Sequence, residues 1–158
     1  VQLKREHNWV IPSRSKLYLA YPDVGLIDED QPITRTQFEL AQLVKIYFTQ
    51  YFANSVSQPD VSSLAQTFKE AQQVNADFLL LPELIALSAN PHAEGERKRI
   101  PNRMQLSFRL FDVRSKKLLD SLRVQGEQGM FNWQKQQPAV LFKSGVQQAA
   151  SALAGELR

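Results

Sequence analysis

The densest group of charged side chains in the sequence lies between residues 94 and 103. It supplies four cations, which are Arg97, Lys98, Arg99 and Arg103. Arginine binds phosphate and carboxylate groups through two parallel hydrogen bonds, so this segment is a candidate site for an anionic ligand or an acidic partner. Two glutamates in the same segment offer partners to these cations. A solvated, self-paired loop is therefore the competing interpretation, and both remain open at this point.

A second candidate is Glu83, which stands inside the apolar run of residues 78–87. A carboxylate in an apolar strand is costly unless it is paired, and such groups gather at functional sites. Glu83, Asp23 or Asp28 would be the acid or base of a soluble hydrolase or transferase. The alternative is a structural role at a strand edge beside Pro82, where proline interrupts the ladder.

The remaining reactive residues are too scattered to form a recognisable catalytic motif. The two histidines, His7 and His92, are far apart, and the sequence has no cysteine, which excludes thiol catalysis and cysteine-ligated metals. No serine stands in a nucleophile-elbow motif. We therefore expect no enzymatic activity, no metal and no cofactor. Trp133 is a candidate anchor for a protein partner, because exposed aromatic side chains often dominate binding.

Composition narrows the class of protein further. The chain has 158 residues, of which 43% are hydrophobic and 22% charged, and its net charge is +3. This length predicts one domain, and the composition is that of a globular protein. The charge is too small to predict nucleic-acid binding, and the longest apolar run is well short of the ~20 residues of a membrane-spanning helix.

These side chains must be positioned by the elements that the hydrophobic pattern predicts. A short strand is expected over residues 16–21, and a helix is expected to begin near Thr36, which has capping-box spacing to Glu39. A brief strand near residues 54–57 and a second helix over residues 63–74 follow, with Asn75 as a left-handed cap. The run of residues 78–87 is apolar on both faces, as in a central strand.

The second half of the chain has a different pattern. Residues 103–113 alternate, with Met104, Leu106, Phe108 and Leu110 on one face, and only three residues separate them from a return strand over 117–128. A last amphipathic helix begins at Pro138, and either a close approach to the sheet or a bend would explain Gly145 within it. We predict an α/β fold with three helices and a mixed sheet of about five strands, with parallel crossovers first and an antiparallel meander second.

The first residues of the chain are polar and aperiodic. They predict an N-terminal tether over residues 1–12, followed by a single α/β domain over residues 13–158. The chain starts at Val1 rather than at methionine, which a removed signal peptide would explain.

Two segments then resemble a known group of proteins. Residues 75–82, Asn-Ala-Asp-Phe-Leu-Leu-Leu-Pro, are similar to the helix-to-strand transition of the TolB N-terminal domain, LpoB and CsgG, and residues 106–121 resemble a hairpin that recurs in the group. Within this group the chain resembles a family of uncharacterised bacterial envelope lipoproteins, over residues 17–153. The lipid-bearing cysteine of such proteins is absent from the sequence.

The resemblance implies a non-enzymatic accessory or adaptor module of the bacterial cell envelope. It implies a periplasmic location, with outer-membrane anchoring through a lipid upstream of Val1, and another envelope protein as partner. It leaves the oligomeric state open. The two alternatives are the carboxylate-dependent hydrolase or transferase built on Glu83 and an anionic-ligand binder using residues 97–103.

Overall fold

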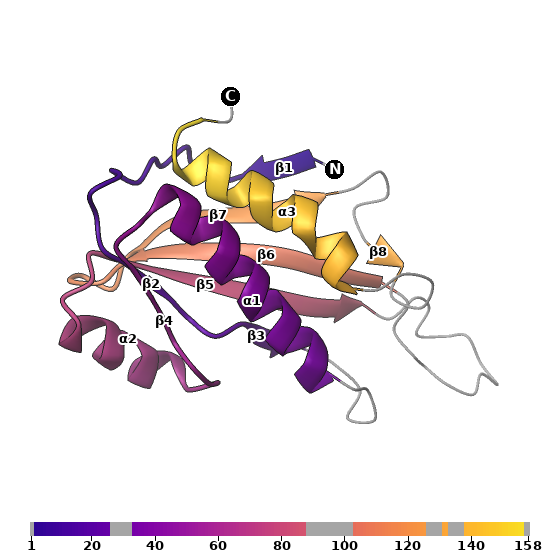
Figure 1. The fold of residues 1–158 in the computed structure, drawn as a ribbon, viewed down its shortest axis with the longest axis horizontal. Helices are drawn as coiled ribbons and strands as arrows, with labels where there is room; N and C mark the ends of the chain where they lie inside the picture. Colours follow the sequence, from indigo (N-terminus) through magenta and orange to yellow (C-terminus); the bar gives the residue numbers. More distant parts are fainter. Residues whose placement is uncertain (1, 26–32, 88–102, 126–130, 133–137, 157–158) are drawn as a thin grey trace.

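The computed structural model describes residues 2–25, 33–87, 103–125, 131–132 and 138–156. They form an α/β fold with three helices and a single mixed sheet (Figure 1). The strands are β1 (Gln2–Arg5), β2 (Leu17–Leu19), β3 (Asp23–Gly25), β4 (Ser55–Ser57), β5 (Phe78–Leu87), β6 (Arg103–Asp112), β7 (Leu118–Gln125) and β8 (Phe131–Asn132). The helices are α1 (Ile33–Tyr51), α2 (Leu64–Gln73) and α3 (Pro138–Leu153).

The order of strands confirms the predicted change of character along the chain. The main path runs β1-β7-β6-β5-β2-β4, with β3 paired to β5 and β8 paired to β6. The strands β2, β3, β4 and β5 pair in parallel, whereas β5, β6, β7, β8 and β1 pair antiparallel. The sheet gains β1, β3 and β8 beyond the five strands expected from the sequence.

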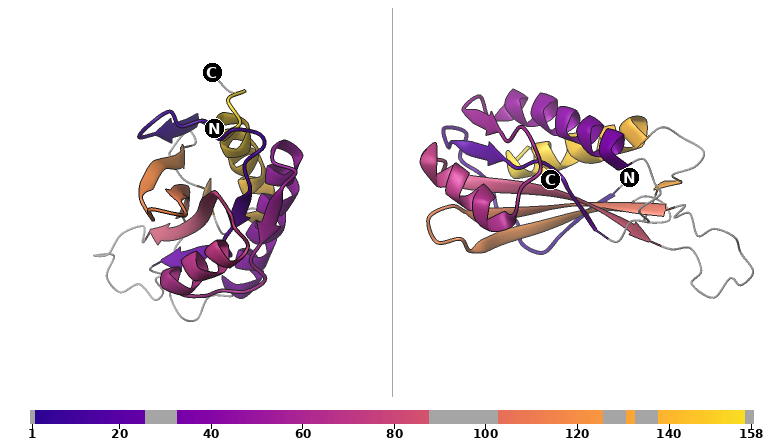
Figure 2. Two further views of the ribbon diagram at one scale, coloured as in Figure 1. Left: turned by 90° about the vertical axis from the view of Figure 1, so that its left-hand side faces the viewer. Right: turned by 90° about the horizontal axis from the view of Figure 1, so that it is seen from below.

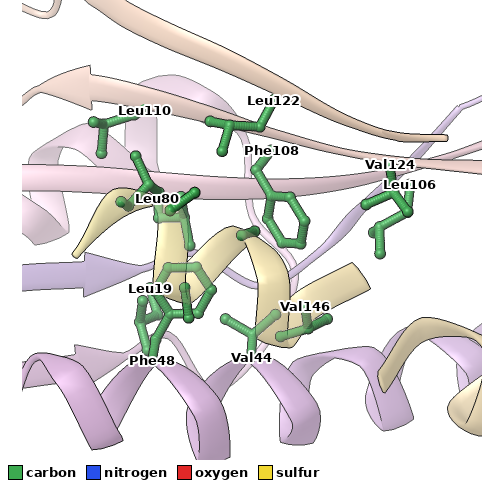
Figure 3. Close-up of a cluster of buried hydrophobic side chains, with 14 of the residues drawn as sticks. Leu19, Val44, Phe48, Leu80, Leu106, Phe108, Leu110, Leu122, Val124 and Val146 are labelled. Atoms are coloured by element: carbon green, nitrogen blue, oxygen red, sulfur yellow. The ribbon is translucent and has the colours of Figure 1, made fainter. Parts of the chain in front are cut away.

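The main core lies between one face of the sheet and the pair of helices α1 and α3 (Figures 1 and 2). Phe108 on β6 is fully buried and its ring lies 6.1 Å from that of Phe48 on α1. Figure 3 shows leucine and valine side chains of the sheet facing Val44 and Val146 of the two helices. The alternation predicted for β6 is confirmed for the side chains of Leu106, Phe108 and Leu110.

The opposite face of the sheet is covered by α2 at one end only (Figure 2). Phe68 and Ala71 of α2 pack there against Leu79 and Phe111. Ser63 is the N-cap of α2, and its side chain accepts a hydrogen bond from Gln66 N. Asn75 follows the end of the helix with a φ of 58°. The left-handed asparagine is as predicted, whereas the capping role of Ser63 was not predicted.

Helix α1 begins at Ile33, three residues before the predicted capping box. Thr36 is buried, in line with Leu40, Val44 and Phe48, so it is one more position of the core-facing side of α1 rather than its cap. Of the two explanations for Gly145, the structure supports a close approach to the sheet. A β-carbon there would lie 2.9 Å from Val124 Cγ2 and 3.3 Å from Leu106 Cδ2.

The expected N-terminal tether is corrected by the structure. Residues 2–5 form β1, which extends the sheet beside β7, and Ile11 is buried with its amide donating to Leu153 O at 2.8 Å. A four-residue edge strand gives almost no periodic signal, and its stabilising partners lie more than 100 residues away in the sequence. Within the described residues, no helix has the length and hydropathy needed to span a membrane.

Candidate functional site

A row of polar side chains crosses the second face of the sheet beyond α2. Figure 2 shows that α2 leaves this region uncovered. Strand register places Lys4, Arg123, Ser107, Glu83 and Asp23 in one row across β1, β7, β6, β5 and β3. The row is cationic at the β1 edge and anionic at the β3 side. This polar row is the first candidate site.

Glu83 is held in this row by Arg109. The Arg109 Nε donates to Glu83 Oε1 at 2.7 Å, and Nη2 donates to Oε2 at 3.3 Å. The guanidinium also lies 5.4 Å from the centre of the Phe111 ring, which is a cation–π distance. The carboxylate proposed from the sequence as an acid or base is therefore half of a two-bond ion pair.

Asp23, another of the predicted carboxylates, lies beside Glu83. It is the Cα partner of Glu83 in the parallel pair of β3 and β5, and it lines a small hollow of about 50 Å³ together with Arg109. The structure thus brings two of the three predicted carboxylates to neighbouring strands. Asp28 lies outside the described residues.

The cationic end of the row has a different environment. Lys4 and Arg123 are direct cross-strand partners and both are exposed. Like charges opposite one another destabilise a sheet, and within the described residues neither has an ion-pair partner. Sequence reasoning missed this pair, because the two cations are 119 positions apart and only the register of β1 with β7 joins them.

Most of the residues predicted to bind an anion or a partner lie outside the residues that the structure describes. Arg97, Lys98, Arg99 and Trp133 lie outside the described residues. Arg103 begins β6, as the Cα partner of Leu87 and of Asn132. His7, by contrast, is described, and its amide donates to Asp120 Oδ1 at 2.9 Å.

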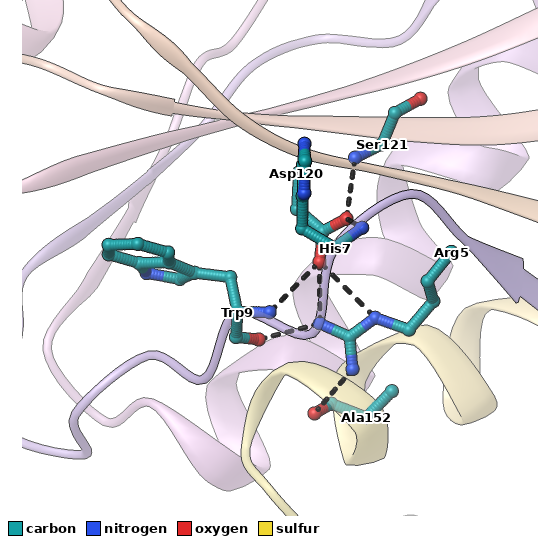
Figure 4. A network of polar contacts seen from close by, with 6 residues as sticks. All are labelled: Arg5, His7, Trp9, Asp120, Ser121 and Ala152. Carbon is teal, nitrogen blue, oxygen red and sulfur yellow. Dashed lines mark hydrogen bonds and ion pairs between the residues drawn. The ribbon is translucent and has the colours of Figure 1, made fainter.

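Asp120 is a buried carboxylate that the sequence did not single out. Its side chain is fully buried and it accepts hydrogen bonds from Arg5 Nε and Nη2 at 3.2 and 2.7 Å (Figure 4). The amides of His7, Trp9 and Ser121 also donate to it, at 2.8 to 3.2 Å. This network fixes residues 5–9 to β7, and a charge satisfied by so many donors is a structural anchor.

The two segments that carried the family resemblance meet at one end of the sheet. They line an open hollow of about 670 Å³, with Asn75 and Asp77 on one side and Asp112 and Arg114 on the other. The carboxylates here serve the turns: Asp77 Oδ2 accepts from Lys16 N at 2.8 Å, and Asp112 Oδ2 accepts from Ser115 N and Oγ at 2.8 Å. The two hydrogen bonds from Ser115 lower the pKa of Asp112. The motifs therefore serve the fold.

A further polar network joins α2 to the sheet. The Tyr18 hydroxyl donates to Glu70 Oε1 at 2.8 Å, and Gln58 Nε2 donates to the same oxygen at 3.1 Å. The bond from Tyr18, then that from Gln58, lowers the pKa of Glu70, while burial and Glu70 raise the pKa of Tyr18. Among the described residues no group of three or more histidine, aspartate or glutamate side chains could hold a metal ion.

The chain is similar to solved structures of other bacterial proteins. The PelC dodecamer from Paraburkholderia phytofirmans matches with a TM-score of 0.61 at 13% identity, covering 97% of this chain and 96% of that chain. The LpoB C-terminal domain from Escherichia coli matches at 12% identity, over 71% of this chain and 83% of that chain, with a TM-score of 0.40. Lipoprotein GNA1162 from Neisseria meningitidis matches at 14% identity, over 88% and 99% of the two chains, with a TM-score of 0.41.

At these identities the match to PelC shows a shared fold, and the TM-scores of the other two are too low to carry an argument. The predicted resemblance to TolB and CsgG stays a prediction. The search of curated proteins finds no match to the chain. The amino-acid sequence identifies a family more specifically than the fold does. Residues 9–153, which include almost the whole described fold, match one family. The chain therefore belongs to the family described as Domain of unknown function (DUF4823).

Proposed function

We propose that this chain is a non-enzymatic accessory module of the bacterial cell envelope that works in the periplasm by assembling with other proteins, including copies of itself. The envelope location is supported by the resemblance of residues 75–82 and 106–121 to domains of envelope lipoproteins. The non-enzymatic role and the assembly are supported by separate observations.

The observation that carries the proposal is the use of Glu83. The rival hydrolase or transferase needs this carboxylate as an acid or base, and both of its oxygens instead accept hydrogen bonds from Arg109. A glutamate whose two oxygens are both bound by an arginine stabilises the sheet and is not positioned as an acid or base. We expect Glu83→Gln and Asp23→Asn to change stability alone. A hydrolytic activity of the wild type that either variant abolishes, in a folded protein, would contradict the proposal.

The assembly is supported by the match to PelC. That protein, which has the same fold over nearly the whole of both chains, is a dodecamer. Among the described residues, Trp9 and Val10 after β1 and Phe38 and Ile46 on α1 are large apolar side chains that are exposed, and exposed apolar side chains can form contact surfaces. Sedimentation velocity on the purified protein at micromolar concentrations tests the proposal. We expect a discrete species of several chains. A monomer at every concentration would count against it.

A second candidate function has one specific observation in its favour. The exposed pair of Lys4 and Arg123 makes the β1 edge of the open sheet face cationic, so an anionic ligand would relieve their repulsion. If this surface binds anions, a sulfated polysaccharide probe should bind the wild type more weakly as salt rises, and Lys4→Gln/Arg123→Gln should bind it at least tenfold more weakly. Unchanged binding by the double variant would remove this candidate.

A further inference from the structure

A partly enclosed pocket lies beside α1, at the carboxyl ends of two parallel strands. Its volume is about 190 Å³. We infer that this pocket binds a small aromatic carboxylate, with the ring of the ligand against the apolar walls and its carboxylate at Lys45. The inference does not depend on the proposed assembly of copies.

The strands β2 and β4 each bring their carboxyl end to the pocket. The lining contains the last residue of each strand and the two residues that follow it, which are Leu19, Ala20 and Tyr21 after β2 and Ser57, Gln58 and Pro59 after β4. The two strands are parallel neighbours in register, so their ends lie together.

The carboxyl end of β2 is also the point at which the path of the chain reverses. The strand β4 lies on one side of β2 and β5 lies on the other. The chain reaches β4 through α1 and returns across β2 to β5 through α2, and the two helices pack on opposite faces of the sheet. In open α/β sheets, ligands bind beyond the carboxyl ends of the strands at such a reversal. The pocket occupies this position.

Much of the pocket wall is apolar. Leu19, Ala20 and Val44 are buried residues of the lining, and the aromatic side chains of Tyr21 and Phe38 complete it. An engineered apolar cavity of roughly 150 Å³ holds one benzene molecule, so this pocket has room for one ring and a small substituent. Phe38 is 54% exposed, and a ligand ring against it would remove apolar surface from water and form an aromatic pair.

The charge of the pocket comes from Lys45. It is the only charged side chain among the described residues of the lining, and it follows Phe38 and Ala41 along the same side of α1. Lys45 is exposed, and in the described part of the chain it has no ion-pair partner. Its flexible four-carbon stem lets the ammonium group reach a carboxylate at the pocket.

The uncharged polar groups of the lining favour the same class of ligand. The side chain of Gln58 is already bonded, because its Oε1 accepts from Tyr21 N at 2.9 Å and its Nε2 donates to Thr67 Oγ1 at 3.0 Å. Gln42 and Ser57 add an amide and a hydroxyl to the lining, and both groups can donate to a carboxylate. The polar contacts of the ligand are therefore expected at Lys45, Gln42 and Ser57.

Benzoate is the probe that tests this site. Ligand-observed saturation-transfer NMR on the full chain measures its affinity whatever the state of assembly, and the wild type should bind with a dissociation constant of about 1 mM or lower. Cyclohexanecarboxylate has the same charge without an aromatic ring, so it should bind at least about threefold more weakly. The inference would be overturned by equal binding of the two probes, or by no saturable binding of benzoate up to about 10 mM.

Two variants locate the binding. Ala41→Leu fills the pocket with a residue that favours helix and should weaken benzoate binding at least about tenfold. Lys45→Gln removes the charge and should weaken it at least about fivefold. Thermal melts by circular dichroism confirm that both variants are folded.

Lys69→Gln is the matched control. Lys69 is an exposed lysine on α2, outside the lining of the pocket, so this variant should bind benzoate as the wild type does. Benzoate binding that Ala41→Leu leaves unchanged would place the ligand elsewhere and overturn the inference. Equal weakening by Lys45→Gln and Lys69→Gln would also overturn it, because the attraction would then come from the general charge of the protein.

Discussion

Asp120 shows how a single residue joins the two ends of this chain. Its partner Arg5 lies 115 positions earlier and also donates to Ala152 O near the end of α3, at 3.4 Å. Nothing in the sequence around Asp120 distinguishes it from an ordinary strand residue, because its role depends on a contact between distant segments. The anchor could therefore be found only in three dimensions.

Removing this charge should be costly. In Asp120→Asn the Arg5 guanidinium loses its counter-ion, and an amide group meets donors on every side, so the free energy of unfolding should fall by about 3–5 kcal/mol. Urea-induced unfolding measures this change. The control Glu6→Gln alters a neighbouring exposed charge and should cost less than about 0.5 kcal/mol. Similar values for the two variants would mean that the network contributes little.

Glu70 should make stability depend on acid. Its pKa is lowered in the folded protein by the hydrogen bonds from Tyr18 and Gln58, so folding favours its ionised form. This contribution is fully present above the unfolded pKa, about 4.3, and is lost as pH falls through the folded value. The melting temperature of the wild type should therefore drop below about pH 4.5, with Asp112 contributing in the same sense.

The variant Glu70→Gln isolates the Glu70 part of this dependence. Melting curves between pH 7 and pH 3 should show a shallower loss for Glu70→Gln than for the wild type, because only Asp112 and weaker groups remain to be protonated. An acid limb as steep as that of the wild type would show that the Tyr18–Glu70 bond is not formed in solution.

The scale of single elements is where the sequence was most informative. The alternation of β6 and the left-handed cap of α2 at Asn75 both depend on local patterns, and the structure confirms each of them. The predicted start of α1 was wrong: Thr36 and Glu39 have capping-box spacing, but the helix begins at Ile33 and Thr36 lies on its buried side. The strands β1, β3 and β8, of two to four residues, are too short to give a periodic signal.

The register of β6 can be tested with neighbouring residues. Phe108 is fully buried between the sheet and α1, so Phe108→Ala should cost about 3–5 kcal/mol through the cavity that it leaves. Ser107 belongs to the polar row on the opposite face of the sheet, and Ser107→Ala should cost less than about 1 kcal/mol. Thermal or chemical denaturation measures both. A larger loss for Ser107→Ala would invert the register.

The contact of α3 with the sheet gives another test. In Gly145→Ala the new methyl group would meet both γ-carbons of Val124, a stiff side chain on β7, so the variant should lose about 1–3 kcal/mol despite the better helix propensity of alanine. The neighbouring exposed position supplies the control, since Ser144→Ala should be neutral or slightly stabilising. A stabilised Gly145→Ala would show that α3 lies farther from β7.

At the scale of the whole molecule, the sequence predicted the fold class and left the function to a resemblance. Helix and strand patterns are local, and they led to the α/β class, the three helices and the antiparallel second half. The row from Lys4 to Asp23 combines residues from distant segments, so only the assembled sheet reveals it.

The central claim, that this chain works by joining copies of itself, is tested most directly by the mass of the purified protein in solution. Sedimentation velocity over a range of micromolar concentrations should resolve a discrete species of several chains. A species with the mass of one chain at every concentration would contradict the account.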